Sequence, residues 1–315
     1  MLTGFMHFAS FIGSAAFYLP LLVIVYWCLE PRVAARAAVL LAFSAALNSV
    51  LKLAFHAPRP FWTDPSIRAG EAHDSFGMPS GHAQNAVVAW GFLAAHLRRR
   101  LAWAAAAVII VLIGVSRIQL GVHSPGQVLA GWGVGAALLV AALVLEPVAV
   151  PWWTRRPLAV QVALALALSL ALLACAWAAL RALGVWHWPV LWARAITAAG
   201  GSPHAVGLSD AAAAAGILFG VLAGVSWLGH HGWFDAGGEV WRRVARLPVG
   251  AAGGLAIYTL GLFLGTRPVQ QFVVQALLGL WIVAGAPETF VRLRLAARTT
   301  PAITPSGEPP AGARQ

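Results

Sequence analysis

Three short segments of the sequence gather basic, hydroxyl and imidazole side chains in a chain that is otherwise apolar. They are Lys52–Pro60 (KLAFHAPRP), Pro79–His82 (PSGH) and Ser116–Gln127 (SRIQLGVHSPGQ). Lys52, Arg59 and Arg117 could together surround a tetrahedral oxyanion. Arginine offers forked donors that suit phosphate oxygens, whereas lysine supplies a compact point charge. The three segments therefore indicate a phosphate-binding site.

The second segment lies where a helix is expected to begin. Free backbone N–H groups and the positive end of the helix dipole favour an anion at such a position. Gly81 has no Cβ, so the backbone can approach a phosphate closely there. Ser80 and Gly81 are thus predicted to complete the phosphate cradle.

Two histidines, His82 and His123, remain for chemistry. One is expected to attack phosphorus and the other to protonate the departing oxygen, because imidazole has a pKa near neutrality. No cluster of carboxylates or cysteines accompanies them, so we expect no metal site and no cofactor. The residues by themselves leave open which histidine does which.

The composition sets the environment of this site. Of 315 residues, 60% are hydrophobic and 10% charged, and the mean hydropathy is +0.78. Soluble domains carry about 25% charged residues. The chain is therefore predicted to be all-α, a polytopic transmembrane helical bundle. About nine spans are expected, at residues 11–29, 34–55, 82–97, 101–117, 125–145, 158–180, 208–228, 249–265 and 269–286.

The basic residues give this bundle a direction. Of the 21 Lys and Arg residues, 14 fall in loops on one side, which the positive-inside rule makes cytoplasmic. The amino terminus and all three motif segments then face the extracytoplasmic side of the membrane, which we take to be a bacterial inner membrane. The net charge of +11 is attributed to basic residues that set the topology and contact anionic membrane lipids, not to a nucleic-acid-binding surface.

Three regions are predicted along the chain. Residues 1–146 would form the membrane-embedded phosphatase core, 147–300 would add transmembrane helices of unknown role, and 301–315 would be a disordered tail. The oligomeric state is not indicated by the sequence.

In order and spacing, the three segments resemble the signature of the type 2 phosphatidic acid phosphatase and vanadium haloperoxidase superfamily, in its integral-membrane phosphatase branch. That signature reads Lys-x6-Arg-Pro, Pro-Ser-Gly-His and Ser-Arg-x5-His-x3-Asp. The resemblance implies a five-to-six-helix phosphatase core around the three segments, and it implies that His123 is the nucleophile and His82 the general acid. It also implies that Lys52, Arg59 and Arg117 bind phosphate, with Ser80 and Gly81 and without a metal.

Gln127 departs from that pattern, since most members have Asp there. An amide oxygen can accept a hydrogen bond from imidazole but cannot offset its charge. The glucose-6-phosphatase and dolichyl diphosphatase branches look similar at this position. Ser124-Pro-Gly-Gln127 also has the pattern of a helix-capping box. The sequence therefore favours neither role of Gln127, support of His123 or capping of the helix, over the other.

Other polar clusters are weaker candidates. Glu71, His73 and Asp74 could gate the substrate, but a solvated loop is the preferred interpretation. His230 and His231 are adjacent and do not share a helix face, which disfavours a metal site. A stripe of glycines at 216, 220 and 224 predicts close helix packing, within the chain or in a dimer.

The preferred function is a metal-independent phosphatase for lipid phosphate monoesters or prenyl diphosphates, such as undecaprenyl diphosphate, with a phosphohistidine intermediate. The alternative is a phosphatase for a soluble sugar phosphate, favoured by the nine spans and Gln127. A haloperoxidase and a non-enzymatic phosphate-binding membrane protein rank lower. Mere binding needs cations, but it needs neither an acid nor a nucleophile.

Overall fold

The computed structural model of the chain describes residues 2–71 and 73–299. Within these ranges the regular elements are helices, apart from one isolated β-bridge between Phe234 and Arg298. This confirms the predicted all-α class. In lipid a helix satisfies the backbone hydrogen bonds within one segment, which suits so apolar a chain. The predicted tail, 301–315, lies outside the described residues.

The number of helices that can cross a membrane is slightly lower than predicted. Among the described residues seven are long and apolar enough, or eight if the bent pair α1 (Leu2–Ile12) and α2 (Ala15–Cys28) forms one span. The prediction of a polytopic bundle is confirmed. The remaining predicted span corresponds to α5 (Gly81–Leu97), which has 17 residues, slightly fewer than the roughly 20 needed to cross the hydrocarbon.

The helices form two compact units whose segments alternate along the chain. The first unit contains the residues up to Pro20, Phe43–Leu145 and Leu172–Ala211; the second contains Leu21–Ala42, Glu146–Ala171 and the residues from Ala212 onward. These boundaries divide the chain by how compactly its segments pack, not by function. The predicted division of roles at residue 146 concerns function and stays a prediction.

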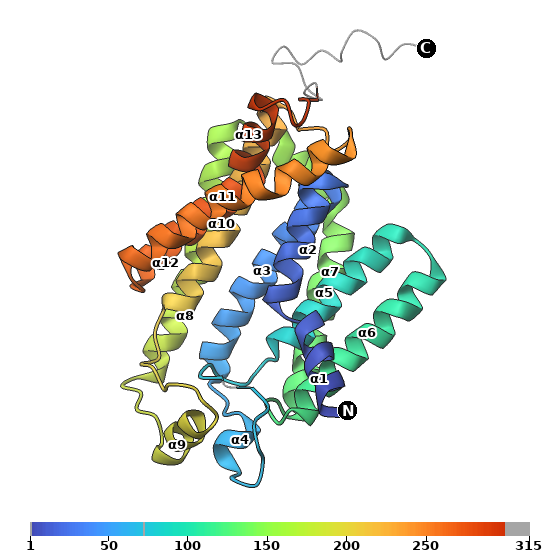
Figure 1. The fold of residues 1–315 in the computed structure, drawn as a ribbon. Coiled ribbons are helices and arrows are strands. Elements are labelled where there is room, and N and C mark those ends of the chain that lie inside the picture. The colour runs from blue at the N-terminus through green and yellow to red at the C-terminus, as the bar shows by residue number, and fades with distance from the viewer. Residues whose placement is uncertain (1, 72, 300–315) are drawn as a thin grey trace. The chain divides into compact units, whose positions relative to one another are not determined.

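The first unit carries the three motif segments. Its further helices are, wholly or in part, α3 (Pro31–Phe55), α4 (Pro60–Thr63), α6 (Arg100–Gln119), α7 (Pro125–Thr154), α8 (Leu158–Leu183) and α9 (Val190–Ala198). Helices α5 and α6 pack as a hairpin, and α9 lies against α4 (Figure 1). Arg98 ends α5 in the left-handed conformation, with φ 54°, where the chain turns into α6.

An aromatic core joins the loop after α8 to the loop that carries Arg59. The ring of Trp62 lies 5.3 Å from that of Trp188 and 5.7 Å from that of Trp192, and Phe76 lies 5.5 Å from Trp186. Tryptophans near span ends commonly lie as anchors at the membrane–water interface. Here these tryptophans pack on one another instead, because the segment Leu172–Ala211 folds onto the motif loops of the same unit.

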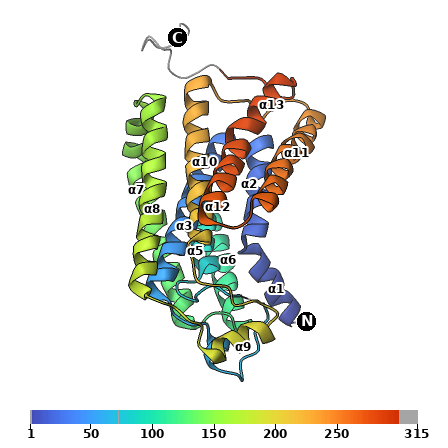
Figure 2. The same cartoon turned by 90° about the vertical axis from the view of Figure 1, so that its left-hand side faces the viewer.

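The second unit contains α10 (Ser209–His231), α11 (Val240–Leu264), α12 (Pro268–Leu280), the π-helical turn η1 (Trp281–Gly285) and α13 (Ala286–Arg292) (Figure 2). The glycine stripe explains how α10 and α12 pack. A Cβ on Gly216 or Gly220 would collide with the backbone of Phe272 or Ala276. The predicted close packing therefore occurs within the chain.

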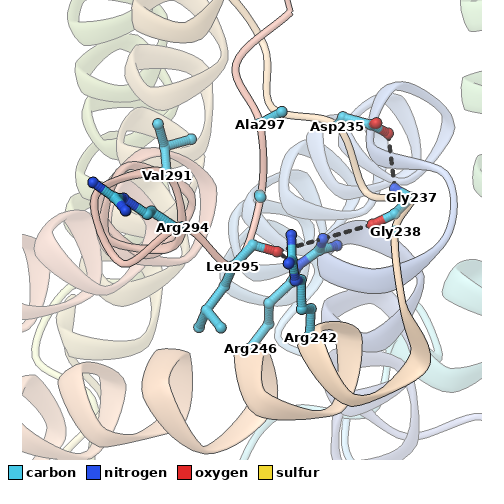
Figure 3. Close-up of a pocket in the computed structure, with 10 residues that line it drawn as sticks. Asp235, Gly237, Gly238, Arg242, Arg246, Val291, Arg294, Leu295 and Ala297 are labelled. Atoms are coloured by element: carbon cyan, nitrogen blue, oxygen red, sulfur yellow. Dashed lines mark hydrogen bonds between the residues drawn. The ribbon is translucent and has the colours of Figure 1, made fainter.

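Arg246 hydrogen-bonds to the loops at one end of the second unit. Its side chain is 1% exposed and borders a pocket of about 310 Å³ together with Asp235, Arg242 and Arg294 (Figure 3). The guanidinium donates to backbone carbonyls on four residues, Trp27, Ala236, Gly237 and Leu295, at 2.7–3.1 Å. Each of its three nitrogens is thereby engaged, so we assign Arg246 a structural role.

Candidate active site

The three motif segments meet inside the first unit. The first is the end of α3 with the start of α4, the second is the start of α5, and the third joins α6 to α7. Hydrogen bonds link them: Arg59 Nη1 lies 3.1 Å from His123 Nε2, and the Ser80 N–H donates to the Gln127 carbonyl at 3.0 Å. The structure thus brings together the segments that the sequence singled out.

Lys52 and Arg59 converge on a residue that the sequence did not single out, Ser75. Lys52 Nζ donates to Ser75 Oγ at 2.9 Å, and Arg59 Nη2 donates to the same oxygen at 3.1 Å. Arg59 Nε also donates to the Ser75 carbonyl at 2.7 Å. One small residue therefore holds both cations, and nothing in the local sequence pattern distinguishes it from other loop serines.

His123 is placed by the turn that ends α6. Gly121 has φ +70°, and a Cβ there would lie 2.8 Å from the Arg68 carbonyl, so the turn requires glycine. The backbone N–H groups of Val122 and His123 both donate to the Arg117 carbonyl at 3.2 Å. The imidazole is 3% exposed and points back into the motif segments.

Gln127 fixes the tautomer of His123. Its amide nitrogen donates to the Pro58 carbonyl at 2.7 Å, which turns the amide oxygen toward His123 Nδ1 at 3.1 Å. That oxygen can only accept, so Nδ1 carries the proton and Nε2 keeps its lone pair. The nitrogen with the lone pair is the one that faces Arg59.

The same glutamine also caps α7. The Ser124 N–H donates to Gln127 Oε1 at 3.2 Å, and the Gln127 N–H donates to Ser124 Oγ at 3.3 Å, which is the predicted reciprocal box. The two interpretations are therefore not exclusive in this structure. Gly77 makes room for the side chain, since a Cβ there would come within 2.8 Å of the Gln127 amide.

The Pro79–His82 segment begins α5 as predicted. Ser80 is fully buried and caps the helix, with its side chain accepting from the Ala83 N–H at 3.5 Å. A Cβ on Gly81 would lie 3.1 Å from Asn48 Oδ1, so its surroundings are tight on the side of α3. His82 is partly exposed and makes no hydrogen bond with the described part of the chain.

Arg117 is surrounded by the loop that was interpreted as solvated. Its Nη1 donates to Glu71 Oε2 at 2.7 Å and to Ser10 Oγ, and its Nη2 lies 2.9 Å from His73 Nε2. For Glu71 and His73 the solvated-loop interpretation was therefore wrong, because both are partly buried against a buried cation. Asp74 is exposed, which agrees with the solvated-loop interpretation for this residue.

Burial and neighbouring charge tune these groups. Burial lowers the pKa of His123 well below its ordinary value of 6.5, and the nearby cations lower it further. The ring is therefore neutral at neutral pH, as a nucleophile must be. Burial likewise lowers the pKa of His73, to about 4. Burial raises the pKa of Glu71, but the charge and hydrogen bond of Arg117, with the hydrogen bond from Ser10, outweigh this and hold it well below the ordinary value.

The described residues contain no group of three His, Cys, Asp or Glu side chains that could hold a metal ion. His230 and His231 contact carbonyls one turn back in their own helix, at 3.0 and 2.9 Å. Those two rings are accounted for by local structure.

Comparison with known protein families finds two family models that match separate ranges of the chain. A family model described as the PAP2 superfamily matches residues 33–151, and one described as PAP2 superfamily phosphatase, transmembrane extension, matches residues 212–298. The first range contains all three motif segments.

Two curated relatives align with the chain. Phosphatidylglycerophosphatase B of Bacillus subtilis (strain 168) is 32% identical over 152 residues, which cover 44% of this chain and 70% of that protein. Lipid phosphate phosphatase delta of Arabidopsis thaliana is 28% identical over 156 residues, covering 44% of this chain but only 37% of the relative. The crystal structure of a transmembrane PAP2-type phosphatidylglycerolphosphate phosphatase from Bacillus subtilis aligns with 27% identity and a TM-score of 0.40, covering 46% of this chain and 77% of that one.

Proposed function

This chain belongs to the PAP2 superfamily and is an integral-membrane phosphatase, and we propose that it hydrolyses lipid phosphate monoesters or prenyl diphosphates without a metal ion. The observation that supports this proposal most directly is the set of contacts made by the His123 imidazole. A glutamine holds the proton on Nδ1, and the unprotonated Nε2 accepts from Arg59 Nη1 at 3.1 Å. A cation beside a neutral imidazole nitrogen suits attack on an anionic phosphorus centre.

The proposed reaction has two steps. First, His123 Nε2 forms an N–P bond while the bond from phosphorus to the departing oxygen breaks, and His82 gives a proton to that oxygen. The departing oxygen is the lipid oxygen of a monoester or the bridging oxygen of a prenyl diphosphate. Second, water attacks the phosphorus of the phosphohistidine while the N–P bond breaks and returns its electron pair to His123 Nε2; His82 takes a proton from the water, and inorganic phosphate leaves. Lys52, Arg59 and Arg117 would neutralise the phosphoryl oxygens in both steps, with the α5 terminus at Ser80 and Gly81.

Several features support this assignment of roles. Arg59, Arg117 and His123 are nearly fully buried, so electrostatic effects on a bound phosphoryl group would be strong. His82 makes no hydrogen bond within the described chain, which leaves its ring nitrogens available to a leaving group. The names of the two curated relatives also favour a lipid phosphate as the substrate class.

The substrate class is tested by comparing rates of phosphate release. We expect prenyl diphosphates and phosphatidate-like lipids to be hydrolysed at least about tenfold more efficiently than glucose 6-phosphate, because binding of a remote lipid tail can contribute to catalysis. The measurement is kcat/KM for each substrate with purified full-length protein, with and without a chelator. Equal or better turnover of the sugar phosphate would instead support the alternative function.

We further propose that the site faces the extracytoplasmic side of a bacterial inner membrane, on the basis of the basic loops. A cysteine introduced at Ser66, near the site in the exposed loop, is expected to react with a membrane-impermeant thiol reagent in intact cells. One introduced at Arg99 should be protected until the cells are permeabilised. The opposite labelling pattern would place the site on the cytoplasmic side.

A further inference from the structure

The guanidinium of Arg117 is held from one end. The side chain is 0% exposed, its Nη1 is shared by Glu71 and Ser10, and its Nη2 contacts His73. Its Nε–H, by contrast, is buried without a hydrogen-bond partner among the described residues. A buried N–H of this kind is costly and calls for an explanation.

We propose that Glu71, assisted by Ser10, is a positioning residue that fixes Arg117 so that its Nε edge is presented to the substrate phosphoryl group. This rests on the proposed function, in which Arg117 binds phosphate. Nε and Nη2 lie along one edge of the planar guanidinium, and such an edge can bind two oxygens of a phosphate. The carboxylate occupies the other end, so phosphate need not displace it.

Charge explains why a carboxylate is used. Among the described residues, Glu71 is the only acidic side chain in an ion pair with any of the three cations of the site. A fully buried arginine beside two further cations would be strongly disfavoured without such a partner. The carboxylate also has geometric support, since Ser10 Oγ donates to Glu71 Oε1 at 2.8 Å.

The contact between His73 and Arg117 requires a particular protonation state of His73. Its Nε2 lies 2.9 Å from Arg117 Nη2 and 3.2 Å from Glu71 Oε2. Arginine can only donate, so the neutral ring with its proton on Nδ1 accepts from Arg117. With a pKa of about 4, the ring stays neutral at neutral pH, and its protonation near pH 4 would place a second cation against Arg117.

Part of this arrangement is supplied from outside the family match. Ser10 belongs to α1 (Leu2–Ile12), and the matched ranges are 33–151 and 212–298. Helix α1 packs on α6, which carries Arg117. The amino-terminal helix thus contributes a contact to the phosphate-binding arginine that the three motif segments do not contain.

The test measures affinity for inorganic phosphate separately from catalysis. In a His123→Ala background, phosphate binding is followed by calorimetry and by the rise in Tm that phosphate produces. Glu71→Gln, which keeps the size but removes the charge, is expected to weaken phosphate binding at least about tenfold, since the hydrogen bond it alters is charge-assisted. Ser10→Ala removes the hydroxyl that accepts from the Arg117 guanidinium and donates to the Glu71 carboxylate, and it should weaken phosphate binding at least about threefold, as expected when a hydrogen bond is lost.

Matched controls separate positioning from general damage. Asp64→Asn changes an exposed acid in the same loop whose carboxylate accepts hydrogen bonds from Ser66 alone among the described residues, and Ser14→Ala removes a hydroxyl that bonds only within its own turn, to the Phe11 carbonyl. Both should leave phosphate affinity within twofold. Glu71→Asp retains a carboxylate and is expected to recover part of the affinity lost in Glu71→Gln, even if the glutamine variant folds poorly.

Unchanged or tighter phosphate binding by Glu71→Gln would overturn the proposal, the tighter case meaning that Glu71 competes with phosphate. Should Glu71→Gln fail to fold, wild-type affinity in both Glu71→Asp and Ser10→Ala would overturn it. These outcomes are independent of the proposed function, which is tested by whether His123→Ala abolishes turnover in the otherwise unaltered enzyme.

Discussion

His123→Ala is expected to abolish turnover, with a loss of at least about 10³-fold in kcat, as is usual when a covalent nucleophile is removed. Without the imidazole no N–P bond can form, and water would have to attack phosphorus directly. The measurement is phosphate release from a lipid phosphate, together with trapping of the phosphoenzyme by an alkaline quench. Wild-type protein should give an acid-labile, base-stable phosphoenzyme and His123→Ala none. A fully active His123→Ala enzyme would refute the assigned mechanism.

Gln127 provides the graded comparison for this prediction. Gln127→Ala removes the acceptor that holds the proton on Nδ1, and we expect a loss of about ten- to a hundredfold, as for other supporting contacts. Gln127→Glu keeps the length and adds a charge, which should raise the pKa of His123. Because the attacking ring must be neutral, the acidic limb of the pH–rate profile should then move to higher pH. An unmoved profile would leave Gln127 as a helix cap only.

His82→Ala is expected to discriminate between leaving groups. For a lipid phosphate, whose departing alkoxide is strongly basic, we expect kcat/KM to fall by about 10²- to 10⁴-fold, the usual range for general acid catalysis. For p-nitrophenyl phosphate the departing oxygen is already a stable anion, so the loss should be far smaller. The measurement is the ratio of the two losses in the same purified variant.

Two controls bear on this result. The wild-type enzyme sets the ratio of the two substrates, and His56→Ala, in an exposed residue of the first motif segment, should leave both rates close to wild type. An equal loss on both substrates in His82→Ala would contradict an acid role, and would indicate that His82 binds the phosphoryl group instead.

The sequence by itself determined the all-α class and the family, and it identified the three motif segments of the candidate site. An apolar chain in lipid has few alternatives to helices, and this physical constraint is why the all-α prediction was correct. The three motif segments could be found because each combines fixed spacing with residue types that are rare in an apolar chain. Both properties can be read without knowing which segments are neighbours in space.

The tertiary structure decided which other residues complete the site. Ser75 and Ser10 were not identified, because a hydroxyl reveals its partner only when distant segments pack together; 23 residues separate Ser75 from Lys52, and 107 separate Ser10 from Arg117. Glu71 was interpreted as a solvated loop acid for the same reason. Its role depends on a buried arginine 46 positions away, which no local pattern encodes.

Gln127 shows where the two kinds of information meet. Its spacing from Ser124 and from His123 was visible in the sequence, and it supported either a helix cap or a contact with the imidazole. The choice required the position of the amide nitrogen, which donates to Pro58 from a segment 69 residues away. That one long-range hydrogen bond orients the amide so that its oxygen serves both partners. A local sequence pattern can therefore name the candidates, but only packing between distant segments fixes how a side chain is turned.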